Sequence, residues 1–223
     1  SASLVGSEMC IRDRDMTIDV LHVMSRHKNI CNHIHLPVQS GSNKILKNMN
    51  RQHTSEEYFN LINLIKKIIP NCAISHDMIS GFPGETEQDH QDTISLMKKI
   101  KYNFGFMFMY SERPGTLAAR KYKDNIPEAV KKRRLGEIIK LQQEHGLYRN
   151  KQFIGHEVEV LVEKVSKKSK NQWSGRTQQN SVVIFNKLYF KIGDYVSVKI
   201  NSATSATLLG EAISYGPTQK NYE

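Results

Sequence analysis

The sequence predicts an α/β domain followed by a small antiparallel β-barrel. Strand-like and helix-like segments alternate from about Met16 to Lys151, which is typical of βα units around a parallel sheet, open or barrel-like. From Ile154 onward apolar and polar residues alternate with a period of two, which indicates short strands with one buried face. The length of 223 residues is enough for a medium domain with a small one attached. We therefore place domains at 15–152 and 153–215.

Helical spacing and short apolar runs predict the elements of the first domain. In order, they are a helix from 16, a strand at 34–38, helices at 43–50 and 55–69, a strand at 73–79, a helix after 86 and a strand at 104–110. Ser55 and Glu56 are residue types that start helices, and Pro70 ends this one. We expect the alternating aromatic residues of the last strand to be core: Phe104, Phe106, Phe108 and Tyr110.

A long basic helix from Glu128 to about Lys151 closes the first domain. Its apolar residues, such as Ile138, suit a core face, and we expect the basic run 131–134 to be solvated. In the second domain, Val158, Val160 and Val162 alternate with glutamates, and we expect about five short antiparallel strands that close into a barrel.

Both ends of the chain are set apart from these domains. Residues 1–14 do not share the periodicity that follows and resemble a translated adaptor sequence, so we exclude them from the fold. We expect residues 216–223 to be a disordered tail.

The composition is basic and polar. There are 32 Lys and Arg against 22 Asp and Glu, which gives a formal net charge of +10, a pI of about 9.4 and a mean hydropathy of −0.51. A basic excess favours a polyanionic partner, although solvated lysines are the ordinary explanation. No apolar run approaches the roughly 20 residues that a membrane span needs, so we expect a cytoplasmic protein without a membrane partner.

The cysteines do not form a metal-binding pattern. Cys10, Cys31 and Cys72 are far apart and make no CxxC or CxxxCxxC motif. Cys72 lies at the start of a predicted strand, where a small buried apolar residue is expected. We therefore predict no metal ligand among them.

Two glycine-containing loops follow predicted strands, where α/β folds place ligands. The loop Gly81-Phe82-Pro83-Gly84-Glu85 leads into a helix, and its glycines allow the backbone to come close to a small molecule. The loop Gln39-Ser40-Gly41 presents hydrogen-bonding groups after the first strand. Ordinary βα turns with a helix cap explain both loops equally well.

Other candidates are single residues. Asp77 lies inside an apolar strand and needs a partner, while Arg51 has a guanidinium that can bind a carboxylate or phosphate. Arg113 and Thr116 flank a Pro-Gly turn that can receive a substrate. In the second domain a basic loop surrounds the only tryptophan and favours RNA contact over an ordinary exposed hairpin; the residues are Lys167, Lys168, Trp173 and Arg176.

Taken together and in order, these motifs resemble one family, the methylthiotransferases of the radical S-adenosylmethionine (SAM) class. The similar runs are HLPVQSGSNKILKNMNR, ISHDMISGFPGET, FMYSERPGTLAARK and, in a module that looks like a TRAM domain, GHEVEVLVEKVSKKS and GRTQQNSVVIF. The resemblance implies that 15–152 is the carboxy-terminal part of a radical SAM partial (β/α) barrel and that 153–215 is a TRAM domain with an OB-like barrel. The loops are most similar to those of members that act on isopentenyladenosine in tRNA.

The resemblance also implies a function for a longer parent protein. It would transfer a methylthio group to carbon 2 of N(6)-isopentenyladenosine next to the anticodon, using SAM, two 4Fe-4S clusters and an electron donor, as a monomer that binds the tRNA anticodon stem-loop. Residues implied at the cofactor are Gln39, Ser40, Gly41, Arg51, Asp77, Gly81, Phe82, Pro83, Gly84 and Glu85. Residues implied at the substrate or RNA are Arg113, Thr116, Lys167, Lys168, Trp173 and Arg176.

One departure from the family pattern is large. The family's three amino-terminal cluster cysteines and its CxxxCxxC motif are not in this sequence, so we expect no catalytic or metal-binding residue here and no activity of the chain by itself. Two alternatives remain open. One is a related methylthiotransferase that acts on threonylcarbamoyladenosine in tRNA or on a ribosomal protein, and the other is a non-catalytic RNA-binding module.

Overall fold

Residues 16–220 are described by the computed structural model, and they divide into two units. The first unit contains residues 34–142 and the described residues up to His27, and the second contains 28–33 and the residues from Gln143 onward. The predicted adaptor-like segment 1–14 and the last three residues of the predicted tail 216–223 lie outside the described residues. Among residues 16–220, no helix combines the length and the apolarity that crossing a membrane requires.

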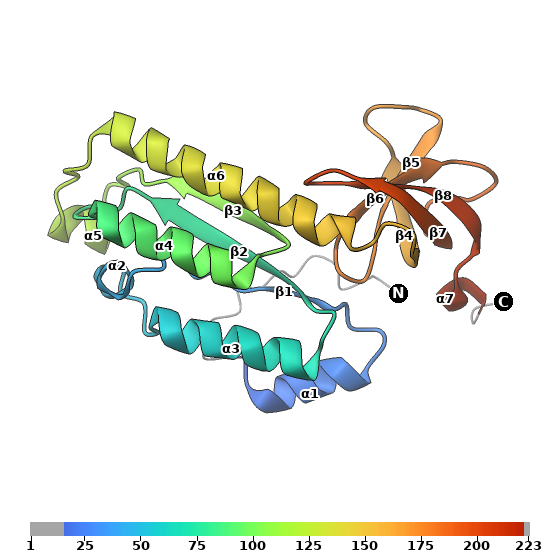
Figure 1. Cartoon of the computed structure of the whole chain (residues 1–223), viewed down its shortest axis with the longest axis horizontal. Helices are drawn as coiled ribbons and strands as arrows, with labels where there is room; N and C mark the ends of the chain where they lie inside the picture. Colours follow the sequence, from blue (N-terminus) through green and yellow to red (C-terminus); the bar gives the residue numbers. More distant parts are fainter. Residues whose placement is uncertain (1–15, 221–223) are drawn as a thin grey trace. The chain divides into compact units, whose positions relative to one another are not determined.

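A sheet in the order β1-β2-β3 forms the centre of the first unit (Figure 1). β2 and β3 are parallel, with Ser75 opposite Phe104 and Ser80 opposite Met109, and Gln39 forms a parallel bridge to Met78. The predicted parallel sheet is confirmed. The strands are β1 (His33–His35), β2 (Ala73–Ser80) and β3 (Phe104–Met109). The helices are α1 (Ile18–Arg26), α2 (Asn43–Asn48), α3 (Ser55–Ile68), α4 (Glu87–Ile100), α5 (Leu117–Lys121) and α6 (Glu128–Lys151).

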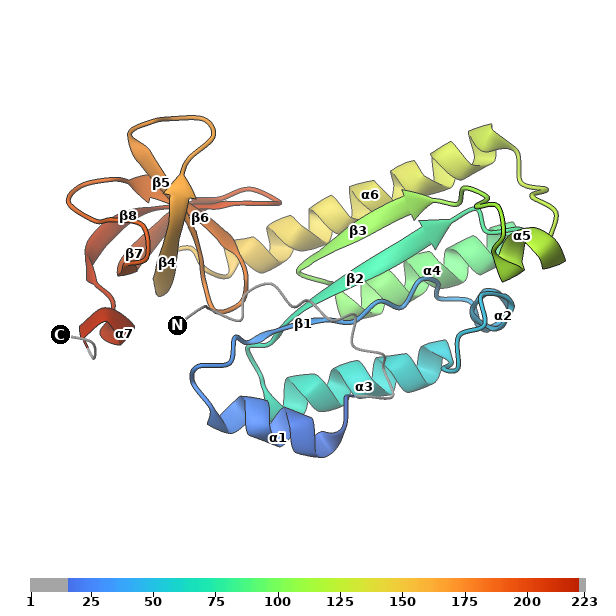
Figure 2. The ribbon, with the colours of Figure 1, turned by 180° about the vertical axis from the view of Figure 1, so that it is seen from behind.

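Helices cover one face of this sheet. α3, α4 and the first part of α6 lie on that side (Figures 1 and 2), and their apolar residues meet those of β2 in one core. Tyr58 of α3, Met97 of α4, Ile138 of α6 and Met78 of β2 are almost fully buried there. Their spacing along each helix is what allowed the elements to be predicted.

The other face of the sheet is not covered by a helix of the described part of the unit (Figure 2). Phe106 and Phe108 of β3 belong to this face and are 53% and 52% exposed. The expectation that they are core residues was therefore wrong, because side chains on alternate positions of a strand point to opposite faces and only one face is packed here. Met107, between them, packs against the core.

Local hydrogen bonds fix the helix starts. Thr54 caps α3 in a reciprocal pair with Glu57, one residue before the predicted start at Ser55 and Glu56. Thr86 caps α4 in the same way with Asp89. The loop 81–85 therefore leads into a capped helix, as the sequence allowed.

α6 differs from its prediction in one respect. Lys132 and Arg133 are exposed as expected, but Lys131 and Arg134 are each only 5% exposed. The expectation that the whole run 131–134 is solvated was wrong, because both buried cations have carboxylate partners from outside α6.

The second unit is a closed barrel in the order β4-β5-β6-β8-β7. Its strands are β4 (Glu157–Val165), β5 (Gln172–Arg176), β6 (Val182–Asn186), β7 (Tyr195–Ala203) and β8 (Leu208–Tyr215). The predicted barrel is confirmed, with the alternating valines Val160, Val162, Val196 and Val198 inside it. β6 and β8 pair in parallel, whereas the other pairings are antiparallel as expected.

The predicted disordered tail is wrong for its described part. Residues Pro217–Lys220 form a short helix, α7. The backbone N–H of Thr218 and its hydroxyl each donate to the carboxylate of Glu159 at 2.6 Å. These two charge-assisted bonds hold the start of the helix on β4.

Candidate functional site

Three loops follow the carboxyl ends of the three parallel strands, at 39–42, 81–86 and 110–116. Because the strands are parallel, these loops meet at one edge of the sheet, which is where open α/β sheets bind ligands. The uncovered sheet face adjoins this edge (Figure 2). The edge and the face together are the candidate site.

The loop after β1 is packed tightly onto α4. The backbone N–H of Gly41 donates to the hydroxyl of Thr93 at 2.9 Å, and Ser40 is 1% exposed. A Cβ at position 41 would lie 2.6 Å from the backbone of Asp92 and Thr93, so this close approach requires glycine. Gln39 is 7% exposed and bridges to β2 through its backbone. The three predicted residues are therefore part of the loop's own packing.

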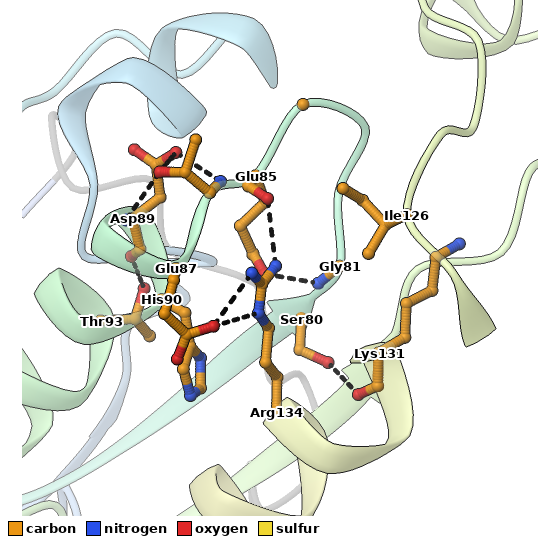
Figure 3. A network of polar contacts seen from close by, with 12 residues as sticks. Ser80, Gly81, Glu85, Glu87, Asp89, His90, Thr93, Ile126, Lys131 and Arg134 are labelled. Carbon is orange, nitrogen blue, oxygen red and sulfur yellow. Dashed lines mark hydrogen bonds and ion pairs between the residues drawn. The ribbon is translucent and has the colours of Figure 1, made fainter. Parts of the chain in front are cut away.

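The loop after β2 is organised by a buried ion pair (Figure 3). The carboxylate of Glu85 accepts from the backbone N–H of Gly81 at 3.0 Å and from Nη1 of Arg134 at 2.8 Å. Arg134 also donates to the backbone oxygen of Glu85 at 3.1 Å. Burial raises the pKa of Glu85, and the Gly81 N–H and Arg134 act against that rise. Glu85 therefore binds the two ends of its own loop and joins them to α6.

A second acidic group joins the first two loops. Asp89 accepts from Nζ of Lys44 at 2.7 Å, from Thr86 at 2.7 Å and from the hydroxyl of Ser42 at 2.7 Å. Burial alone would raise the pKa of Asp89, but the hydrogen bonds from these three residues hold it well below its usual range. Asp89 is therefore an ionised link between the loop after β1 and α4.

Aromatic residues fill the space between the second and third loops. Phe82 is 4% exposed and packs edge-on against Tyr110 and Tyr122, with ring centroids 5.1 and 5.8 Å apart. Lys131 lies 5.2 Å from the centre of the Tyr110 ring and forms an ion pair with Asp124. The Tyr110 hydroxyl is buried and has no hydrogen-bond partner among residues 16–220. In this structure the hydroxyl is enclosed by protein atoms.

The uncovered face carries a polar group in its middle. His35 of β1 contacts Ser75 through Nδ1 at 2.8 Å and Asp77 through Nε2 at 3.4 Å. Phe106 packs edge-on against the His35 ring at 6.0 Å. Asp77, predicted to need a partner, thus has one in His35, and its side chain is still 20% exposed.

The remaining loop residues have simpler surroundings. Arg51 and Arg113 are exposed, and Thr116 caps α5 while its hydroxyl donates to the backbone oxygen of Arg113 at 2.9 Å. Pro83 is buried. Gly84 donates its N–H to Asn125 at 2.8 Å. Thr116 therefore has a structural role in addition to any contact with a ligand.

The four predicted RNA-binding residues of the barrel differ in their exposure and in their existing hydrogen-bond partners. Lys167 and Lys168 are exposed, as such a role requires. Trp173 is half-buried, and its indole N–H donates to the backbone oxygen of Phe190 at 3.1 Å. Arg176 pairs with Glu163 at 3.4 Å and donates to Asn180, so its guanidinium already has acceptors within the barrel.

Sequence reasoning missed Lys131, Arg134 and Tyr110 as members of the site. The sequence does show that the two cations share one helix face, because they stand three residues apart. Their partners Asp124 and Glu85 come from other segments, and nothing in the local pattern pairs them.

The described residues do not fit an iron–sulfur cluster. Such a cluster needs several thiolate ligands, and the cysteines of residues 16–220 are Cys31, which is exposed, and Cys72, which is buried. Burial raises the pKa of Cys72 to about 12, which keeps it a thiol. Its prediction as a small buried residue is confirmed.

One group of side chains has the composition of a metal site, namely Glu87, His90 and Glu137. His90 contacts Glu137 at 2.7 Å, and Arg133 pairs with Glu87 at 2.6 Å and with Glu137 at 2.5 Å. The hydrogen bond from Arg133 is the main cause that lowers the pKa of Glu87 to about 2. Arginine already neutralises these carboxylates, so the group is an ion-pair network.

Comparisons with known proteins agree with this architecture. A model of the radical SAM superfamily matches residues 5–97, and a model of the TRAM domain matches residues 151–213. The chain is 63% identical over 202 residues to tRNA-2-methylthio-N(6)-dimethylallyladenosine synthase of Flavobacterium psychrophilum, across 91% of this chain and 42% of that protein. It is 52% identical over 200 residues to the protein of the same name from Bacteroides thetaiotaomicron, across 90% and 44%. The chain thus spans less than half the length of these curated relatives.

A solved structure with a similar fold is coproporphyrinogen III oxidase of Escherichia coli, described as a radical SAM enzyme. It superposes with a TM-score of 0.52 at 17% identity, over 75% of this chain and 45% of that one. At this identity the likeness concerns the fold alone.

Proposed function

Because the chain belongs to the methylthiotransferase family of radical SAM enzymes, with a TRAM barrel after its α/β domain, we propose that it is part of a tRNA-modifying enzyme. The reaction is the transfer of a methylthio group to carbon 2 of N(6)-isopentenyladenosine next to the anticodon. The observation that carries the proposal is the identity of 50–63% to relatives that bear the name of this activity. The open strand-end site supports it.

SAM fits the strand-end site. When bound, SAM supplies the methyl group and the 5′-deoxyadenosyl radical of this class of reaction. The chain's own contribution is to bind and orient: Asp77 offers a partly exposed carboxylate on the open face. Gly84, whose added Cβ would meet nothing within 4 Å, leaves room for a ligand beside the loop.

The other predicted cofactor residues act by holding the loops in place. Gln39, Ser40 and Gly41 fix the first loop against β2 and α4, and Glu85 with Arg134 fixes the second. A rigid loop keeps a bound cofactor in one orientation, which is the positioning that such chemistry needs. The cluster chemistry has no ligand set in residues 16–220, so we assign no step of it to them.

The substrate side of the proposal involves both units. Arg113 and Thr116 lie on the exposed loop after β3, and Lys167 and Lys168 are exposed on the barrel, where phosphates can reach them. A tRNA partner is consistent with the net charge of +10. We further propose that the full-length enzyme receives electrons from a donor, that it is cytoplasmic and that it is a monomer.

The test uses the full-length protein that contains this chain, reconstituted with its clusters under anaerobic conditions. It is incubated with SAM, a reductant and tRNA from cells that carry isopentenyladenosine without the methylthio group. Mass spectrometry of the nucleosides should show a 2-methylthio product of isopentenyladenosine, and no product with the 223-residue chain alone. A methylthio group found only on threonylcarbamoyladenosine or on a ribosomal protein would overturn the assignment.

The contribution of the open face is tested by Asp77→Asn in the same full-length protein. If Asp77 contacts the cofactor, the variant loses activity while far-UV circular dichroism and tRNA binding stay unchanged. The matched control is Asp92→Asn, which alters an acidic residue on α4 away from the open face. Equal activity of both variants would remove Asp77 from the proposed site.

A further inference from the structure

The segment between β6 and β7 exposes apolar side chains that the barrel core does not use. Leu188, Tyr189 and Ile192 are 65%, 62% and 60% exposed. Leu188 has φ 45°, a left-handed backbone that branched side chains rarely adopt. The segment therefore combines an unusual backbone conformation with two consecutive exposed side chains, Leu188 and Tyr189.

The Tyr189 ring packs against two other aromatic rings of the barrel. It lies 4.4 Å from the ring of Phe190 and 5.8 Å from that of Tyr215, measured between centroids. Phe190 is 3% exposed and belongs to the barrel core, and its backbone oxygen accepts the indole N–H of Trp173. Tyr189 therefore offers a free, rigidly supported aromatic surface, which needs little ordering when a ligand stacks on it.

Lysines lie on the same loop as Tyr189 and on the neighbouring β4–β5 loop. Lys187 lies 4.4 Å above the Trp173 ring, and Lys191 is exposed on the same loop. The backbone N–H of Lys187 donates to the backbone oxygen of Asn171 at 3.1 Å, which places the basic β4–β5 loop alongside. That loop carries three exposed lysines: Lys167, Lys168 and Lys170.

The positive charge and the exposed aromatic ring together indicate which kind of partner binds this surface. A second copy of this chain would bring the same lysines face to face, which opposes self-association. A nucleic acid supplies phosphates for the lysines and bases for the ring, and an unpaired base is the part that can stack.

We propose that residues 187–192 form a stacking platform for an unpaired RNA base, with Tyr189 under the base and Lys187 and Lys191 at the flanking phosphates. This inference rests on the proposed function only for the identity of the RNA. In this proposal the RNA base stacks on Tyr189 and not on Trp173, because Lys187 covers the Trp173 ring.

The test measures binding of the purified 223-residue chain by fluorescence anisotropy. The probes are an unstructured RNA octamer and an isopentenylated anticodon stem-loop, each in a salt series. The variants are Tyr189→Ala, Tyr189→Phe and Lys187→Gln, with Lys199→Gln on β7 as the matched loss of one exposed charge elsewhere on the barrel. Far-UV circular dichroism checks that each variant folds.

Tyr189→Ala should weaken binding of the octamer by about 10-fold, because one stacked base is lost, while Tyr189→Phe should retain affinity. Lys187→Gln should reduce the salt dependence by about one charge, and Lys199→Gln should leave it unchanged. Octamer affinity of Tyr189→Ala equal to that of the unaltered chain, or no octamer binding at all, would overturn the platform.

The two probes separate this inference from the proposed function. Tyr189-dependent binding of the octamer without preference for the stem-loop supports the platform and counts against a tRNA enzyme. Preference for the stem-loop that is unaffected by Tyr189→Ala supports the tRNA enzyme and counts against the platform.

Discussion

Replacing Arg134 by methionine tests whether the Glu85–Arg134 pair holds the loop after β2. Both side chains are almost fully buried, at 6% and 3% exposure, and methionine keeps most of the length of the arginine chain. The change leaves the Glu85 carboxylate with the Gly81 N–H but without its arginine partner. Removing one partner of a buried pair costs about 3–5 kcal/mol. We therefore expect a loss of stability of about 3 kcal/mol near neutral pH.

Urea unfolding followed by far-UV circular dichroism measures this loss. With a slope of about 1–3 kcal/mol per molar urea, a change of about 3 kcal/mol lowers the midpoint by about 1–3 M. The control is Arg133→Met, one position earlier on α6, whose partners Glu87 and Glu137 are exposed to solvent. Because water screens those pairs, the control should lose far less.

The pH dependence gives an independent check. The pKa of Glu85 is already raised in the folded chain by burial, and removing Arg134 takes away an interaction that lowers it. The folded variant therefore binds a proton more tightly than the unfolded chain, and its stability rises as pH falls through the raised pKa. The deficit relative to the unaltered chain should therefore shrink as pH falls from neutral toward the ordinary pKa of a glutamate.

A double-mutant cycle with Glu85→Gln decides whether the pair itself is responsible. If the two residues act together, the double variant should lose clearly less than the sum of the single losses, by up to about 3 kcal/mol. Additive losses within about 0.5 kcal/mol, or a loss in Arg134→Met no larger than in Arg133→Met, would refute the reasoning.

Three further outcomes are expected. Gly41→Ala should destabilise the chain by about 1–3 kcal/mol in urea unfolding, because its added Cβ would lie 2.6 Å from backbone atoms. Gly136→Ala, which has open space on α6, should stabilise the chain by about 1 kcal/mol. The opposite order of stabilities would contradict the packing around Gly41. Iodoacetamide should label the exposed Cys31 and reach Cys72, with its pKa of about 12, only on unfolding, which mass spectrometry of peptides resolves. Urea unfolding observed by Trp173 fluorescence should differ in midpoint from that observed by circular dichroism, since the tryptophan reports the barrel alone; coincident curves would show one cooperative unit.

The order and type of the elements could be predicted because each depends on local periodicity. Ile138 marks the core face of α6 by its spacing, and Val160 and Val198 mark the barrel interior by alternation. The predicted helix start at Ser55 is confirmed, and the residue that caps it, Thr54, was not named because its reciprocal bond with Glu57 becomes visible only in the fold.

The site could be predicted less well because its contacts join distant segments. Arg134 looks solvated on its own helix, and only the fold brings it to Glu85, 49 residues away. Phe106 and Phe108 share a strand face by sequence, but whether another element covers that face is a tertiary property. Loop positions after strands were found correctly since parallel strands bring their carboxyl ends to one edge.

The closure of the β4-β5-β6-β8-β7 barrel has a consequence for how such a module can be reused. Every strand has a partner on both sides, so no row of unpaired backbone groups is left to recruit strands from a new neighbour. Its core of valines and aromatics is complete within residues 153–215, because the cluster draws no member from outside that span. A module with these properties can be attached to another domain without offering its strands an open edge to pair with, and it carries its lysine-rich loops with it.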